Sequence, residues 1–231
     1  MAHLPAPSAA ARSVFGDELG AAERYAELLA GPGIAHGHLG PREVQRLWDR
    51  HLVNSAVVTD LLPTGATVVD VGSGAGLPGL PMAIRRVDLS VILLEPMQRR
   101  TLFLEQAVGE LDLAGRVQVV RGRADDEPVR ALLSGQQWVT ARAVAPLERL
   151  IRWCLPLLAP GGRLLALKGS RAADEVDRFR EGAPRDLRDA VADIDVATLA
   201  AEDGAHGSAD VTTVVRVVRS ARSQARRRRT G

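Results

Sequence analysis

The segment from Val68 to Gly79 constrains the fold most strongly, because an apolar run passes directly into a glycine-rich stretch. Its sequence is Val-Val-Asp-Val-Gly-Ser-Gly-Ala-Gly-Leu-Pro-Gly, which predicts a buried strand, a tight turn and the start of a helix. Glycine allows such a turn to bring backbone N–H groups against a nucleotide-like ligand. The segment therefore predicts an α/β domain that binds a ligand at the end of its first strand.

Short apolar runs separated by helical stretches continue along the chain. We predict strands over residues 67–71, 91–95, 117–120, 138–141 and 163–167, and helices over residues 80–86, 97–111, 128–134, 146–158 and 172–181. Such runs suit parallel strands that are covered on both faces. Residues 191–196 and 211–218 form two last strands with no long helix between them, which predicts a hairpin at the sheet edge. We therefore expect a Rossmann-like, mostly parallel sheet with an antiparallel edge strand.

The regions outside this α/β domain, which we place at 63–218, differ in character. Residues 1–62 are predicted to be a helical N-terminal segment, with a flexible lead over 1–15, a helix over 17–29 and a second helix from Pro41 towards Leu62. Residues 219–231 are predicted to be a disordered, arginine-rich tail.

The formal charge of +2 is unevenly distributed along the chain. Residues 216–231 hold seven arginines and no acid, which leaves 23 basic and 28 acidic residues in 1–215. A basic tail on an acidic body is typical of proteins that contact a nucleic-acid backbone, because cations displace its counterions. A disordered tail that only increases solubility is an equally good interpretation.

Composition excludes several other classes of protein. Cys154 is the only cysteine, so an internal disulfide is impossible, a metal site is not expected, and its helical spacing with neighbouring leucines predicts a buried apolar role. No apolar run approaches the ~20 residues of a membrane span, and the first residues lack a signal-peptide pattern. We expect a cytoplasmic protein, without a membrane partner and monomeric by default.

The glycine loop alone leaves the ligand open. Gly74, Gly76 and Gly79 also match the G-x-G-x-x-G pattern of dinucleotide-binding loops. The second predicted strand ends at Glu95, 19 residues after Gly76, and an acid there can bind the ribose hydroxyls of either NAD or S-adenosylmethionine. These features predict an adenosine-containing ligand without choosing between the two.

Asp70 favours S-adenosylmethionine. This carboxylate stands two residues before the first glycine of the loop, where it would attract the cationic amino-acid half of S-adenosylmethionine and repel a pyrophosphate. The hairpin ending also fits a class I S-adenosylmethionine-dependent methyltransferase better than a second dinucleotide-binding half. A nicotinamide enzyme, or a nucleotide-binding module without chemistry, stays the alternative.

Four blocks with a specific order and spacing resemble one family of such enzymes. They are residues 50–55 (Arg-His-Leu-Val-Asn-Ser), 70–79, 141–143 (Ala-Arg-Ala) and 166–169 (Ala-Leu-Lys-Gly). Together they are similar to the 16S rRNA guanine-N7 methyltransferases known as RsmG or GidB, over about residues 48–169. Asn54 stands where the family usually has an aspartate, the family's Asn-Leu-Thr motif is not visible around residues 35–40, and the arginine tail is not part of the family pattern.

The resemblance implies a cofactor, a partner and a set of contacts. S-adenosylmethionine would be held by Gly72 and Leu77 in the loop, by Ala124 and Asp125 after the third strand and by Arg142 after the fourth, with Glu95 on the ribose and Asp70, Gly74 and Gly76 completing the site. The partner would be 16S rRNA within the 30S subunit or an assembly intermediate. A methyltransferase of the same fold that acts on a metabolite or a protein is the alternative.

A guanine N7 target determines what the side chains have to do. N7 carries an in-plane lone pair and no hydrogen, so we predict no catalytic base and expect the enzyme to align the reactants, an effect worth about 7–11 kcal/mol. Cations would grip O6 or a phosphate. The candidates for RNA contact are Arg50, His51, Arg123 and Lys168, and the candidates for positioning the target are Arg142 and Lys168. Lys168 is the only lysine beside 29 arginines, whereas His51 beside Trp48 favours a structural role.

Overall fold

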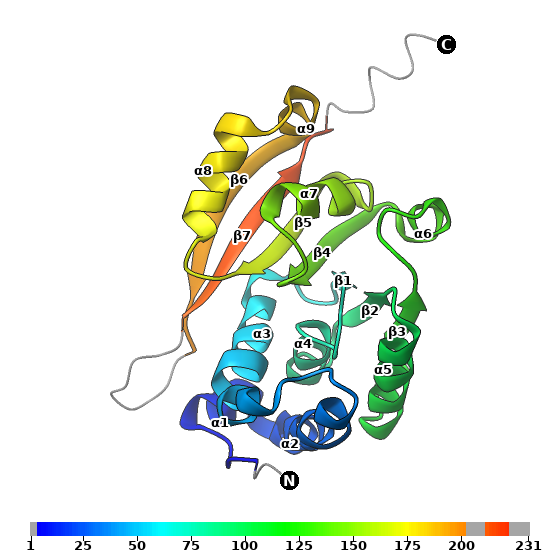
Figure 1. Cartoon of the computed structure of the whole chain (residues 1–231), viewed down its shortest axis with the longest axis vertical. Helices are drawn as coiled ribbons and strands as arrows, with labels where there is room; N and C mark the ends of the chain where they lie inside the picture. Colours follow the sequence, from blue (N-terminus) through cyan, green and yellow to red (C-terminus); the bar gives the residue numbers. More distant parts are fainter. Residues whose placement is uncertain (1–3, 202–210, 222–231) are drawn as a thin grey trace.

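A seven-stranded sheet forms the middle layer of the computed structural model, which describes residues 4–201 and 211–221 (Figure 1). Its order is β3-β2-β1-β4-β5-β7-β6. The strands are β1 (Thr67–Val71), β2 (Ser90–Glu95), β3 (Val117–Arg121), β4 (Gln136–Arg142), β5 (Leu158–Lys168), β6 (Val191–Leu199) and β7 (Thr212–Arg219). All pairs are parallel except β5 with β7 and β7 with β6. The predicted mostly parallel sheet with antiparallel pairing at one edge is therefore confirmed.

Two hydrophobic cores lie on the two faces of this sheet. Alternation along β1 directs Val68 into one core and Val69 and Val71 into the other. The first core is covered by α1 (Ala9–Phe15), α2 (Leu19–Leu28), α3 (Asn54–Ala56), α4 (Gly79–Arg85) and α5 (Gln98–Glu110). The second is covered by α6 (Glu127–Leu133), α7 (Leu147–Cys154), α8 (Ala172–Gly182) and α9 (Arg185–Asp189).

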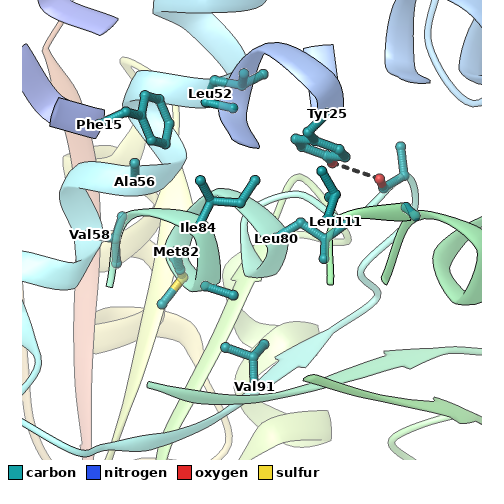
Figure 2. Packing of buried hydrophobic residues seen from close by; sticks show 14 of the residues in the cluster. Phe15, Tyr25, Leu52, Ala56, Val58, Leu80, Met82, Ile84, Val91 and Leu111 are labelled. Atoms are coloured by element: carbon teal, nitrogen blue, oxygen red, sulfur yellow. Dashed lines mark hydrogen bonds between the residues drawn. The ribbon is translucent and has the colours of Figure 1, made fainter. Parts of the chain in front are cut away.

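The N-terminal helices are part of the first core rather than a separate unit. Figure 1 shows α1, α2 and α3 gathered beside α4, and Figure 2 shows Phe15, Leu52 and Ile84 within one cluster. Figure 2 also shows the hydroxyl of Tyr25, which is fully buried and donates a hydrogen bond of 2.7 Å to the backbone oxygen of Ala75 in the glycine loop. The N-terminal segment therefore supports the loop directly.

The predicted flexible lead over residues 1–15 is wrong where the structure forms α1. Ser8 caps this helix by accepting a hydrogen bond from the Ala11 N–H, and Trp48 donates from its indole nitrogen to the Pro5 oxygen at 2.8 Å. The helix buries Ala11 and Phe15. An alanine-rich stretch has a weak periodic signal, and contacts that are distant in sequence hold it in place.

The second predicted helix of the N-terminal segment forms as a series of short helical turns. These are η3 (Pro41–Arg46), η4 (Leu47–Val53), α3 and η5 (Val57–Leu61), with 3-10 geometry at both ends and wider π turns in the middle. The wider turns bury Trp48, His51 and Leu52 together. The stretch ends at Leu61, and β1 begins at Thr67.

The boundary between α7 and β5 also differs from expectation. The helix predicted to reach residue 158 ends at Cys154, and β5 already begins at Leu158. Gly161 and Gly162, which fall between the predicted helix and the predicted strand, lie inside β5 where its pairing with β4 shifts register. A Cβ at Gly162 would lie 2.7 Å from the Gln136 oxygen, so glycine lets the two strands approach closely there.

Three further predictions concern the C-terminal tail, Cys154 and membrane-spanning helices. The predicted tail starts too early, because Arg219 ends β7 and donates to the Leu155 oxygen at 3.0 Å; residues 222–231 lie outside the described residues. Cys154 is buried as predicted, and burial raises the pKa of its thiol. Within the described ranges, no helix is long and apolar enough to cross a membrane.

Two leucines on α5 provide a matched test of the first core. Leu104 is fully buried, whereas Leu102 is 57% exposed. We expect Leu104→Ala to lower the free energy of unfolding by about 2–5 kcal/mol, because it leaves a cavity. Leu102→Ala should change it by less than about 0.5 kcal/mol. Urea denaturation monitored by circular dichroism measures both free energies, and equal effects would contradict the burial of Leu104 in the first core.

Candidate functional site

A cavity of about 470 Å³ opens at the carboxyl ends of the parallel strands. Its volume lies within the range of about 300–1,000 Å³ that is typical of small-molecule sites. The wall consists of Val71–Ala75 and Leu77 after β1, Leu94–Met97 and Arg100 after β2, Gly122–Asp125 after β3, Arg142–Val144 after β4, and His38, Leu39, His51 and Trp153. The cavity thus lies where β1 and β4, neighbours in the sheet, lead to helices on opposite faces, a usual place for ligands in α/β sheets.

The glycines of the loop have different tasks. Gly72, Gly74 and Gly76 have φ angles of +73°, +60° and +102°, a region that other residues avoid. A Cβ at Gly72 would lie 2.8 Å from Val144, and one at Gly76 would lie 2.4 Å from Leu80. A Cβ at Gly74 would have its nearest neighbour, the Gly72 backbone oxygen, 3.9 Å away. Gly74 therefore leaves open space beside the backbone, whereas Gly76, which does not line the cavity, allows close packing.

Glu95 joins the loop to the end of β2. Its Oε2 accepts a hydrogen bond of 2.9 Å from the Gly74 N–H, and its Oε1 accepts one of 3.0 Å from the Met97 N–H. The residue is 1% exposed and lines the cavity. Each carboxylate oxygen can accept a further hydrogen bond, so the side chain can receive hydroxyl groups of a ligand.

Asp70 does not face the cavity, which corrects the prediction that its charge meets the ligand. The side chain lies beneath the loop, fully buried, and its Oδ2 accepts a hydrogen bond of 3.0 Å from the Gly79 N–H at the start of α4. Its Oδ1 is buried without a hydrogen-bond partner among the described residues. Burial raises the pKa of Asp70 to about 7. Asp70 therefore supports the loop from below.

Arg142 connects β4 to the N-terminal segment. Its two terminal nitrogens donate to the oxygens of Arg50 and His51, to the hydroxyl of Ser55 and to Nδ1 of His51, at 2.8–3.0 Å. Four of the five N–H groups of the guanidinium are thereby used. Burial lowers the pKa of Arg142 to about 10. The residue lines the cavity, but this arrangement leaves no free fork to clamp a guanine.

His51 lies between Arg142 and Glu43. Because Arg142 donates to Nδ1, the other ring nitrogen carries the hydrogen and donates to Glu43 Oε2 at 2.7 Å. Burial and, second, the charge of Arg142 lower the pKa of His51. The neutral ring thus fills a structural position, in agreement with the role that the sequence favoured, while one part of it lines the cavity.

The residues after β3 lie in the cavity wall as a group. Ala124, Asp125 and Arg123 all line it. The guanidinium of Arg123 donates to both oxygens of Asp125, at 2.9 and 3.0 Å, and lowers the pKa of that carboxyl. Arg50, by contrast, lies outside the wall, with a side chain that is 52% exposed.

Lys168 is not in this cavity. Its ammonium donates to the Ala145 oxygen at 2.8 Å and to Glu175 Oε2 at 2.9 Å, and the side chain is 8% exposed. It lines a separate cleft on the other side of residues 143–146. The geometry therefore favours a positioning role within the chain over direct contact with a target base.

Several wall residues were not predicted from the sequence. His38 and Leu39 come from the stretch around residues 35–40, where no motif was visible. The ring of His38 lies 4.9 Å from that of Phe103, and its Nδ1 is buried without a hydrogen-bond partner among the described residues. No local pattern announces these contacts, because packing of the N-terminal segment creates them. Val144, however, directly follows the block at 141–143.

The raised pKa of Asp70 predicts a pH dependence of stability. The native protein holds a proton that the unfolded chain releases near the ordinary aspartate value of about 3.9. This contribution to stability is fully present below pH ~4 and is lost as the pH rises through about 7. Asp70→Asn keeps the shape and cannot titrate. We therefore expect the unfolding free energy of wild type, relative to that of Asp70→Asn, to fall between pH 4 and 8; parallel curves would refute the protonated, buried carboxyl.

The chain is similar to one family of methyltransferases over most of its length. The family model for rRNA small subunit methyltransferase G (GidB) matches residues 18–186. Ribosomal RNA small subunit methyltransferase G of Salinispora arenicola is 56% identical, over 78% of this chain and 78% of its own. The protein of the same name from Thermobifida fusca is 57% identical, over 81% of this chain and 77% of its own.

Solved structures add evidence on the fold alone. A SAM-dependent O-methyltransferase from Thermotoga maritima superposes with a TM-score of 0.54 at 15% identity, covering 77% of this chain and 70% of that one. The sheet of this chain thus has the predicted Rossmann-like methyltransferase fold. From the extent of the family match and the identity to its curated members, the chain belongs to the rRNA small subunit methyltransferase G family.

Proposed function

We propose that this chain transfers a methyl group from S-adenosylmethionine to N7 of a guanine in 16S rRNA. The observation that carries the proposal is the cavity in which Glu95 and the Gly74 backbone meet, in a chain that belongs to this family. The coarser conclusion, that the chain is a methyltransferase, follows from the family.

The residues of the cavity fit the proposed cofactor. Gly74 leaves room for close approach to the backbone, and Glu95 offers buried carboxylate lone pairs to ribose hydroxyls. Gly72, Leu77, Ala124 and Asp125 line the same space. Once bound, S-adenosylmethionine supplies an electrophilic methyl group on a sulfonium. Arg142 would act here mainly by holding the cavity wall that includes His51.

The target chemistry requires positioning rather than proton transfer. Guanine N7 has a free lone pair, so the chain need not supply a base, and the neutral, doubly hydrogen-bonded His51 is consistent with that. An extruded, unpaired guanine is the form that could reach a cavity of this kind. Arg50, which lies outside the cavity wall, and Arg123, which lines the cavity while paired with Asp125, have exposed side chains and would contact RNA.

The partner is proposed to be 16S rRNA in the 30S subunit or in an assembly intermediate, with the enzyme acting as a monomer in the cytoplasm. The arginines of residues 222–231 lie outside the described residues, and their role as an RNA handle stays a prediction. The acidic balance of residues 1–215 makes local cationic surfaces important for this contact.

The function can be tested directly. The purified full chain is incubated with methyl-labelled S-adenosylmethionine and 30S subunits from a strain that lacks the gene. We expect label in 16S rRNA, and cleavage by borohydride and aniline at one guanosine, which marks N7-methylguanosine. Subunits, intermediates and naked RNA should be compared. No label in any of them, or label without such cleavage, would overturn the N7 assignment.

Glu95 gives a second test that needs no RNA. Both carboxylate oxygens of Glu95 accept a hydrogen bond from a backbone N–H, one from Gly74 and one from Met97. In Glu95→Gln, an NH₂ group replaces one of these oxygens, so a donor then faces a donor and one of the two hydrogen bonds is lost. We expect affinity for S-adenosylhomocysteine, measured by calorimetry, to fall at least tenfold. Glu110→Gln, at the exposed end of α5, is the control and should bind like wild type. Tight binding of NADH instead would point to the nicotinamide alternative.

A further inference from the structure

A second cleft of about 470 Å³ lies at the same edge of the sheet as the cavity. It is lined by Ala145, Pro146, Leu147, Glu148, Lys168, Arg171, Glu175, Arg178 and Phe179. These residues come from the start of α7, the end of β5, the residue before α8 and the part of α8 up to Phe179. Because β4 and β5 are parallel, with Arg142 paired to Leu167, their carboxyl ends lie side by side.

Residues 143–146, here called the strap, separate the two hollows. Ala143 and Val144 line the cavity, whereas Ala145 and Pro146 line the cleft. On the cavity side, Val144 packs so closely on Gly72 that a Cβ there would lie 2.8 Å from it. The strap is therefore a shared wall.

The floor of the cleft is held by an internal ion pair. Glu175 Oε2 accepts from Lys168 at 2.9 Å and from the Leu147 N–H at 2.8 Å, and Lys168 also donates to the Ala145 oxygen. The charge of Lys168 is compensated there, and the pKa of Glu175, which burial alone would raise, is lowered by this partner. Lys168 thus fixes the strap and is not the group that a ligand would meet first.

Two exposed arginines provide the uncompensated charge of the cleft. Within the described residues, the guanidinium of Arg171 has no hydrogen bond or ion pair, and that of Arg178 donates only from its Nε, to the Asp174 backbone oxygen at 3.0 Å. The acids of the cleft are engaged elsewhere, Glu175 by Lys168 and Glu148 by Arg152. The free guanidinium forks favour an anion with several oxygens, and they match a phosphate in two-pronged geometry.

We propose that the second cleft binds a phosphodiester of the RNA strand that flanks the target guanine. Arg171 and Arg178 would hold the phosphate, and the strand would cross the strap to deliver the neighbouring base into the cavity. Such a contact fixes the register of the RNA without reading its sequence. The inference rests on the proposed function. It assigns the RNA contact to Arg171 and Arg178 instead of Lys168, which the sequence had suggested.

The experiment compares Arg171→Glu/Arg178→Glu with Arg185→Glu/Arg188→Glu in the full chain. The control pair carries the same change of charge on α9, which Figure 1 shows beside the C-terminal end of α8 and which does not line the cleft. Binding of unmethylated 30S subunits and of 16S transcript is measured against salt. For the cleft variant we expect at least tenfold weaker binding and a slope of log K on log salt that is smaller by about 1–2. Calorimetry with S-adenosylhomocysteine should give wild-type affinity.

Each outcome has a clear meaning. If the cleft variant and the α9 control bind RNA equally and share one slope, the cleft is not a phosphate site. If the cleft variant loses S-adenosylhomocysteine binding instead, the arginines act through the strap and the proposal is wrong. Arg171→Gln/Arg178→Gln, which only removes charge, covers the case in which the reversed charges unfold the protein. If the wild-type chain binds no S-adenosylhomocysteine, the proposed function is wrong, and this result differs from the one that would overturn the cleft alone.

Discussion

Four hydrogen bonds from one guanidinium hold the two parts of the site together. Arg142, at the end of β4, binds backbone and side-chain acceptors between residues 50 and 55. Taking a guanidinium out of water is costly, and the four acceptors offset that cost. The same segment brings His51 to the cavity wall. The N-terminal residues before it bring His38 to the wall and support the loop through Tyr25, so the N-terminal segment forms part of the cavity.

The sheet could be predicted because its signals are local. Strand β1 has the predicted bounds, because four of its five residues have β-branched side chains and Gly72 follows it directly. Helix α1 could not be predicted, because its anchor, Phe15, is buried by residues far along the chain such as Leu52 and Ile84. The start of β5 was missed for the same reason: Gly162 looks like a turn residue unless one knows that the Gln136 oxygen lies against it.

At the site, spacing located the residues but not the direction of their side chains. Glu95 and the loop were placed correctly beside one another. Asp70 was expected to meet the ligand, but alternation along β1 puts its side chain on the same face as Val68, under α4. Arg142 and Lys168 were predicted to position the target, yet both donate hydrogen bonds to groups within the chain. Only the folded structure reveals which charges are already compensated.

The strap between the two hollows has a thermodynamic consequence. Val144 of the strap packs on Gly72, and Ala145 of the strap accepts a hydrogen bond from Lys168, so a shift of the strap towards one occupant would change its fit to the other. Coupling between two binding sites is reciprocal: if an occupied cavity strengthens binding in the cleft by some factor, an occupied cleft strengthens binding in the cavity by the same factor. Four residues would then link recognition of the nucleic acid to retention of the methyl donor, without any large movement of the fold.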